Sequence, residues 1–416
     1  MFRLFTLFTC FLLLAATSTF VYAAKPKPEY FTVSPSDMWA YWLLFLTPAS
    51  LAFFPVKFDK NVNYILWAIV GLLCILIVGL RFEVGGDWNN YLTKLDTARL
   101  VNFGISEITE SSFGNAIGYM IINWVALQVG GGIYFVNTFC AAAFIVGLVL
   151  FCRQQPFPWV ALAVAIPYMT CAVAMGYTRQ SAALGFLLMG LSILRKGNEL
   201  KYFVLLFFGS LFHLSVIITL PLILLAREKI HWLAYPILIM FLYGLLTMMS
   251  QIETRGGANM LQGMAVIWEY TRTRESAGGV LRTYLNAVPV LVSLFYWKKI
   301  KMMSMADKNR NYYTNYRVIK WMSIACILAI PALSIGPTLI DRLGLYLMPV
   351  QVALWPRIIA AQRTTLLRST WASMIISFYA LVLYVFFHYA VHNHFWIPYR
   401  MWPFSSEAIY PLPIPM

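Results

Sequence analysis

The feature that most limits how this chain can fold is a series of apolar runs, each about 17–25 residues long, that recurs along its whole length. As a helix, each run is long enough to cross a hydrocarbon core of roughly 30 Å. Charged residues make up only 11% of the chain, whereas they make up about 25% of a soluble domain. No polar stretch is long enough to hold a soluble domain. The sequence therefore predicts an all-α polytopic integral membrane protein.

The apolar runs predict about eleven transmembrane helices, or ten if the first is removed. Residues 4–24 are apolar, and Val21-Tyr-Ala23 resembles a signal-peptidase site, so we expect 1–24 to be a first transmembrane helix or a signal peptide. We expect residues 25–400 to form a single multi-span membrane domain, followed by an outer tail at 391–416. The other expected spans are 38–54, 64–80, 133–152, 157–175, 180–195, 232–250, 281–297, 317–333, 338–355 and 370–390.

One apolar segment is expected to form a re-entrant hairpin instead of a single span. It lies between Arg195-Lys196 and Arg227-Glu-Lys229, and basic flanks of this kind prefer the cytoplasmic side. A single crossing would place one of the two flanks on the opposite side. A hairpin that descends at 202–211 and returns at 214–226 keeps both on the same side, with His213 at its tip.

The distribution of charge predicts the orientation. With the hairpin, the N-terminus lies in the cytoplasm and the C-terminus outside, and the inner loops hold 19 of the 31 Lys and Arg residues but four of the 16 acids. The inner loops therefore carry the whole net charge of +15, which the positive-inside rule explains without a nucleic-acid partner. The long outer loops are 81–132 and 251–280. Nine of the 12 outer cations are arginine, whose planar fork suits phosphate and carboxylate.

The densest polar cluster follows the apolar run 64–80. Four side chains that carry charge or a hydroxyl surround the pair Gly85-Gly86, namely Arg81, Glu83, Asp87 and Tyr91. In a structural interpretation, Asp87 caps a helix, and Arg81 extends to the interface with Glu83 as its ion-pair partner. In the functional interpretation, which we favour, a cation and two carboxylates meet at the mouth of a cavity.

Two further arginines lie at the outer ends of expected helices. Arg179 opposes the dipole of a helix N-terminus, and an anion bound there would be attracted by both the guanidinium and the free backbone N–H groups. The alternative to anion binding is that the Arg179 side chain simply extends to the membrane interface. Arg342 and Tyr346 lie one turn apart on one helix face, and Asp341 either caps that helix or neutralises Arg342.

The remaining polar positions allow simpler explanations. His213 is either a satisfied core group or, as an ionisable group within the membrane, a functional one. Four outer arginines belong to a solvated loop or to an anion-binding lid, namely Arg255, Arg272, Arg274 and Arg282. His392 and His394 have no neighbouring carboxylate, and the six cysteines have no ligand spacing, so we expect no metal. Nucleotide-binding and hydrolase motifs are absent from the sequence, so we expect no cofactor.

These residues resemble the EpsG family of bacterial polysaccharide polymerases, which is related to the Wzy-type O-antigen polymerases. The run Arg81–Tyr91 is similar over its full length to the arginine, glycine and aspartate motif that follows an early helix in this family. Three later elements occur in the family's order, namely Arg179-Gln180, Phe212-His213-Leu-Ser215, and Asp341-Arg342 with Tyr346. The resemblance covers roughly residues 60–400.

The resemblance implies a GT-C-like architecture and a membrane glycosyltransferase. Such proteins join oligosaccharide repeat units carried on polyprenyl diphosphate, on the outer face of the bacterial inner membrane. They transfer the growing glycan from its carrier to the next lipid-linked unit. The implied partners are this lipid-linked oligosaccharide, the bilayer, a chain-length regulator and a flippase.

On this hypothesis, Glu83, Asp87 and His213 are catalytic. Glu83 or Asp87 would orient or deprotonate the acceptor hydroxyl. The residues expected to bind the diphosphate and the glycan are Arg81, Tyr91, Arg179, Gln180, Arg342 and Tyr346. Two alternatives stay open. An O-antigen ligase uses the same donor and topology with a different acceptor, and a flippase requires a charged path with access from both faces.

Overall fold

The computed structural model describes residues 33–53, 59–100, 116–194, 197–226, 278–306, 316–334, 337–390 and 392–404, and the single position 239. Several sequence predictions fall outside these residues: the segment 1–24, nearly all of the span 232–250, and most of the outer loop 251–280 with Arg255, Arg272 and Arg274. The described part of the chain is helical and contains no β-sheet. One isolated antiparallel bridge there joins Arg81 to Met401.

The longer described helices match the expected spans in order. They are α2 (Trp39–Ala52), α3 (Lys60–Gly79), α7 (Gly132–Arg153), α8 (Pro158–Ala165) with its wider π-helical continuation η2 (Ile166–Ala174), α9 (Thr178–Ile193), α14 (Gly279–Leu294), α16 (Tyr316–Ala332), α18 (Pro349–Ala360) and α19 (Thr365–Tyr389). The shorter helices are η1 (Pro35–Met38), α4 (Trp88–Leu100), α6 (Ile117–Gln128), α10 (Glu199–Ser210), η3 (Leu214–Thr219), α11 (Leu222–Leu225), α15 (Trp297–Ala306), α17 (Pro337–Gly344), η4 (Leu345–Leu347) and η5 (Asn393–Phe395).

Three described helices, α3, α7 and α19, are long and apolar enough to cross a membrane. Two bent pairs also pass this test, α14 with α15 at 84° and Ile340–Leu347 with α18 at 42°, which brings the number to five. These helices agree with a helical membrane protein. The expected number of eleven spans stays a prediction, because helices such as α2 and α9, with 14 and 16 residues, are shorter than a full crossing.

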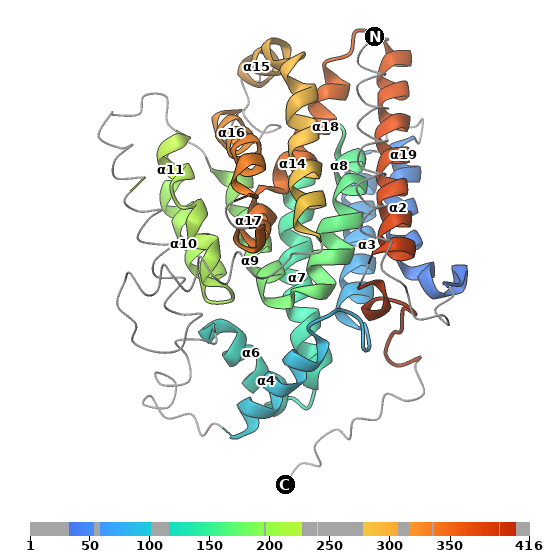
Figure 1. Cartoon of the computed structure of the whole chain (residues 1–416), viewed down its shortest axis with the longest axis vertical. Helices are drawn as coiled ribbons and strands as arrows, with labels where there is room; N and C mark the ends of the chain where they lie inside the picture. The colour runs from blue at the N-terminus through green and yellow to red at the C-terminus, as the bar shows by residue number, and fades with distance from the viewer. Residues whose placement is uncertain are drawn as a thin grey trace.

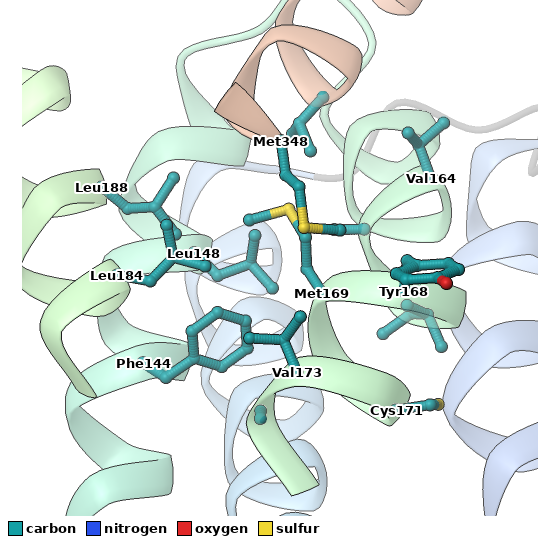
Figure 2. Close-up of a cluster of buried hydrophobic side chains, with 14 of the residues drawn as sticks. Phe144, Leu148, Val164, Tyr168, Met169, Cys171, Val173, Leu184, Leu188 and Met348 are labelled. Carbon is teal, nitrogen blue, oxygen red and sulfur yellow. The ribbon is translucent and has the colours of Figure 1, made fainter. Parts of the chain in front are cut away.

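The apolar core lies where α7, α8 with η2, and α9 meet. Figure 2 shows Phe144 and Leu148 of α7 facing Leu184 and Leu188 of α9, with Met348 packed beside them. The backbones of α7 and α9 approach closely, since a Cβ atom added to Gly185 would lie 2.3 Å from the carbonyl oxygen of Ala143. Small residues at such a crossing allow tight van der Waals packing between helices in a membrane.

The apolar segment after α9 forms the predicted hairpin. The hydroxyl of Tyr202 on α10 donates a hydrogen bond to the carbonyl oxygen of Thr219 on η3, at 2.9 Å. In one continuous helix these two residues would lie about 25 Å apart along the axis, so the chain must reverse between them. The turn comprises 211–213, which places His213 at the tip as expected.

The two ends of the molecule differ in character (Figure 1). The short helices α4 and α6 lie at one end, and the lysine-bearing helix α15 lies at the opposite end. The tail segment 392–404 returns to the turn that follows α3. The N–H of Phe82 donates to the carbonyl of Arg400, and the N–H of Gly85 donates to the carbonyl of Phe395, at 2.9 and 2.8 Å. The tail therefore supports the polar motif that begins at Arg81.

Candidate active site

Arg81 is buried behind the motif, with an exposed fraction of 1%. Its guanidinium donates to the backbone carbonyls of Val78 and Val84 and, through Nη2, to Thr178 Oγ1 at 2.7 Å and to Asn137 Oδ1 at 3.4 Å. All of these acceptors are neutral. Arg81 thus joins the end of α3 to α7 and to the first residue of α9, and its donors are already engaged within the protein.

Gly85 allows the motif to lie directly on the chain that precedes α9. Its φ is +108°, a conformation that L side chains rarely adopt. A Cβ atom at this position would lie 2.1 Å from the carbonyl oxygen of Met175, well inside van der Waals contact. The absence of a side chain therefore lets the turn press against the segment that leads to Arg179.

The two carboxylates of the motif have different surroundings. Glu83 has a φ of +53°, and its side chain forms a half-exposed ion pair with Arg400 of the tail at 3.1 Å. The expected pairing of Glu83 with Arg81 is therefore not present, because Arg81 points inward to neutral acceptors. Asp87 is half-buried directly before α4, and its Oδ1 accepts a hydrogen bond from Asn90 at 3.1 Å.

Tyr91 connects the motif to α9. The Tyr91 hydroxyl lies close to the backbone N–H of Arg179, a donor in the first turn of α9 that has no partner within the helix. Burial raises the pKa of this hydroxyl and the Asp87 carboxylate raises it further, whereas Arg179 lowers it. The net direction is upward, so Tyr91 keeps its proton at neutral pH. Tyr119 of α6 lies beside it with 5.7 Å between the ring centroids.

Five of the predicted residues meet around the hairpin tip, together with Ser215. Gln180 Nε2 donates to the backbone carbonyl of Arg342 at 3.1 Å, and the Gln180 side chain also hydrogen-bonds to Tyr346. The hydroxyls of Tyr346 and Ser215 lie 2.7 Å apart, and Ser215 Oγ lies 2.5 Å from Nδ1 of His213. We call this set the Arg179–Arg342 cluster: Arg179, Gln180, His213, Ser215, Arg342 and Tyr346.

The two arginines give the cluster its positive charge. Both lie close enough to His213 to interact electrostatically with its ring. Arg179 is partly exposed and Arg342 is exposed, so both can reach a ligand. Among the described residues, no carboxylate forms an ion pair with Arg179. A guanidinium at a helix N-terminus without a carboxylate partner is suited to bind an anion.

The comparison with family models matches residues 64–401 to the EpsG family. The chain belongs to the EpsG family. EpsG is a Wzy-like family of polysaccharide polymerases, so membership indicates a membrane protein of polysaccharide biosynthesis with glycosyltransferase-like activity. No curated protein and no solved structure matched the chain. All nine predicted site residues of this EpsG protein lie inside the matched range.

The structure brings six of the nine together, namely the five predicted residues of the Arg179–Arg342 cluster and Tyr91. It separates the other three, Arg81, Glu83 and Asp87, from them. Tyr91 contacts the first turn of α9, and Asp87 lies one helical turn before it. Arg81 is buried behind the site, and Glu83 turns toward the tail. In the described residues of this EpsG protein, no group of three or more His, Cys, Asp and Glu side chains could hold a metal ion.

Sequence reasoning missed several contributors to the site of this EpsG protein. Ser215 joins His213 to Tyr346, Tyr119 packs on Tyr91, and Arg400 pairs with Glu83. Ser215 belongs to the motif Phe212-His213-Leu-Ser215 named from the sequence, but it was given no role there. Tyr119 and Arg400 carry no local signal, because their partners lie far away in the sequence.

Proposed function

We propose that this protein is a glycosyltransferase that polymerises oligosaccharide repeat units carried on polyprenyl diphosphate, for an exopolysaccharide or an O-antigen. The observation that carries this proposal is the Arg179–Arg342 cluster. It gathers two guanidinium groups at the ends of α9 and α17, around a histidine that is hydrogen-bonded to Ser215, whose hydroxyl in turn contacts that of Tyr346. A diphosphate leaving group needs cations that stabilise its charge more than it needs a nucleophilic side chain.

In the proposed reaction, Arg179 and Arg342 bind the diphosphate of the donor. A hydroxyl oxygen of the acceptor sugar attacks the anomeric carbon of the donor, and the bond from that carbon to the diphosphate oxygen breaks. The diphosphate leaves with the electron pair, and the two arginines stabilise its developing charge. Preorganised groups of this kind contribute roughly 3–4 kcal/mol each.

The proton of the acceptor hydroxyl needs a base. Asp87 is the first candidate, because it lies beside Tyr91, whose hydroxyl contacts Arg179. Glu83 is the second, but its ion pair with Arg400 must open first. His213 is placed to move a proton near the diphosphate through Ser215 and Tyr346. Tyr91 and Gln180 orient the substrate, and Arg81 supports the site from behind.

We propose that the site faces the outer side of the bacterial inner membrane. Exposed cations gather at the other end of the described molecule, near α15: Lys298, Lys301, Arg363 and Arg368. Lys299 of α15 donates to the carbonyl of Ala361, which places the loop after α18 at this same end. The positive-inside rule supports a cytoplasmic position for these cations. We further propose that the chain works with a flippase and a chain-length regulator, and without nucleic acid.

Purified protein in lipid nanodiscs, supplied with a synthetic polyprenyl-diphosphate oligosaccharide, tests the proposal. A ladder of products supports a polymerase. A single transfer to a different lipid would instead identify a ligase, and movement of the substrate between leaflets without a covalent product would identify a flippase. Most of the candidates gather in one cluster around His213 and are not spread along a path through the molecule, which favours the enzyme.

Variants of the two arginines connect the activity to the site. Arg179→Ala and Arg342→Ala should each lower the rate by about 10²–10³-fold. Arg363→Ala is the matched control, because Arg363 is exposed and close to the α15 end. Normal product ladders from both site variants, with protein inserted at the wild-type level, would refute the assignment of these arginines.

A further inference from the structure

A buried ion pair lies directly behind the two proposed phosphate-binding arginines. Arg282 on α14 contacts Asp341 on α17 with 2.5 Å between Nη2 and Oδ2, and both side chains are less than 10% exposed. Asp341 is the residue immediately before Arg342. One turn further along α14, the amide nitrogen of Asn286 donates to the carbonyl of Gly344 at 3.0 Å. One face of α14 therefore holds the short helix α17 at two points.

The same guanidinium also contacts the segment that leads into α9. The rings of Tyr168 and Tyr177 lie 5.7 and 6.0 Å from the Arg282 Cζ atom, so both aromatic side chains lie beside the guanidinium. Tyr177 precedes Thr178, the first residue of α9, and Arg179 follows. Arg282 thus touches both chain segments that carry the two arginines of the cluster.

A planar guanidinium is well suited to this position. It donates along several directions at once, so it can hold a carboxylate on one edge while its face and other edge meet aromatic rings. Removing one partner of a buried pair leaves an uncompensated charge, which forces the surrounding segments to move. Displacement of a binding group by about 1 Å can lower the reaction rate by a factor of the order of 100.

We infer that Arg282 is a positioning residue for donor binding. Through Asp341 it holds Arg342, and through Tyr177 it holds the first turn of α9, so it sets the distance between the two guanidinium groups that bind the diphosphate. This inference rests on the proposed function, because it assumes that Arg179 and Arg342 bind one diphosphate. Arg282 does not itself contact the substrate.

The test is direct binding of a fluorescent polyprenyl diphosphate to the purified full-length protein in nanodiscs. Arg282→Gln should weaken binding by about 5–150-fold. Thr283→Val is the matched control, because Thr283 is buried on the same helix and its hydroxyl bonds only locally, to Gly279 at 2.9 Å. Arg282→Lys keeps the charge but not the planar guanidinium group, so its affinity should lie between those of the wild type and Arg282→Gln.

Asp341→Asn separates positioning from simple electrostatics. This variant adds one net positive charge beside Arg342, so long-range attraction alone would strengthen binding of the diphosphate. The positioning role predicts weaker binding instead, and faster amide hydrogen exchange over residues 337–347. Tighter binding by Asp341→Asn, or wild-type affinity in Arg282→Gln, would overturn the inference.

The polyprenyl alcohol without diphosphate provides the remaining comparison. Its affinity should stay unchanged in Arg282→Gln, and an equal loss for the alcohol and the diphosphate would overturn the positioning role in favour of general damage to the lipid site. The two proposals fail in different ways. A wild-type protein that makes no ladder refutes polymerisation, whereas the binding comparison still decides the role of Arg282.

Discussion

Gln180 Nε2 donates a hydrogen bond to the backbone carbonyl of Arg342, and the two residues lie 162 positions apart in the sequence. This contact joins the first turn of α9 to the end of α17, and the adjacent residue of α9 is Arg179. The amide of Gln180 also reaches Tyr346. One neutral side chain therefore links both arginines to the hydroxyl chain that ends at His213.

Loss of the Gln180 amide should affect binding more than folding. Gln180→Leu keeps the approximate volume but removes a hydrogen bond with a net value of about 0.5–1.5 kcal/mol. We expect up to a tenfold higher donor KM with a small change in melting temperature. Steady-state kinetics of the ladder reaction measure this, and an unchanged donor KM would contradict it.

The hydroxyl chain from His213 to Tyr346 should behave as one unit. Tyr346→Phe and Ser215→Ala each break it. Because either change separates His213 from the Tyr346 hydroxyl, we expect the double variant to lose little more activity than the stronger single variant. Tyr202→Phe, which loses only the bond to Thr219, serves as the control. Fully additive losses would show that the two hydroxyls act separately.

Gly85 and Gly86 should respond differently to the same substitution. Gly85→Ala puts a Cβ atom 2.1 Å from the Met175 carbonyl oxygen at a φ of +108°, whereas Gly86→Ala meets its nearest atom, Phe395 Cδ2, at 3.7 Å. Strained backbone alone costs of order 1–3 kcal/mol. Gly85→Ala should lower both the melting temperature and the activity, and Gly86→Ala should be tolerated. Equal thermal stability of the two variants would contradict the packing of the motif on Met175.

Asp87→Asn separates a helix cap from a catalytic base. Asn caps helices about as well as Asp, so the melting temperature should be unchanged, while loss of the proton acceptor should lower the rate by about 10²–10⁴-fold. Glu83→Gln should keep most of the activity, because its half-exposed pair with Arg400 has a small energetic value. Inactive Glu83→Gln beside active Asp87→Asn would reverse the two roles.

Tyr119→Phe tests a buried hydroxyl. The Tyr119 oxygen has no hydrogen-bond partner among the described residues, although the side chain is 2% exposed. Removing an unsatisfied buried polar atom does not destabilise a fold, so the melting temperature should stay the same or rise. Tyr399→Phe is the contrast, because its hydroxyl donates to Ile77 at 2.6 Å and its loss should be destabilising. Equal destabilisation by both would show that Tyr119 has a structural partner.

The local patterns in the sequence predicted the helices and the hairpin well. Apolar runs indicate where helices lie, and the basic flanks of the segment after α9 required a reversal near His213, which the Tyr202–Thr219 contact confirms. The EpsG assignment from the Arg81–Tyr91 motif is also confirmed. Each of these signals is contained within about one or two helix lengths of sequence.

The contacts between distant segments could not be predicted in the same way. Glu83 adopts a positive φ that a non-glycine residue rarely shows, and its partner Arg400 lies 317 positions away. Arg282 was assigned to a loop or a lid, whereas it is buried against Asp341. Hydrophobic periodicity does not predict which polar helix ends will meet, because tertiary packing decides which helix ends become neighbours.

The tail segment has a consequence for how the protein is made. The backbone around Phe82 and Gly85 is bonded to residues 395–400, and the ribosome synthesises these after nearly all of the helices. Chains fold from the N-terminus during synthesis, so the polar motif emerges early and must wait for the tail before its turn is complete. A nascent chain that stalls before Phe395 would therefore insert its helices while the turn at Phe82 and Gly85 still lacks its backbone partners.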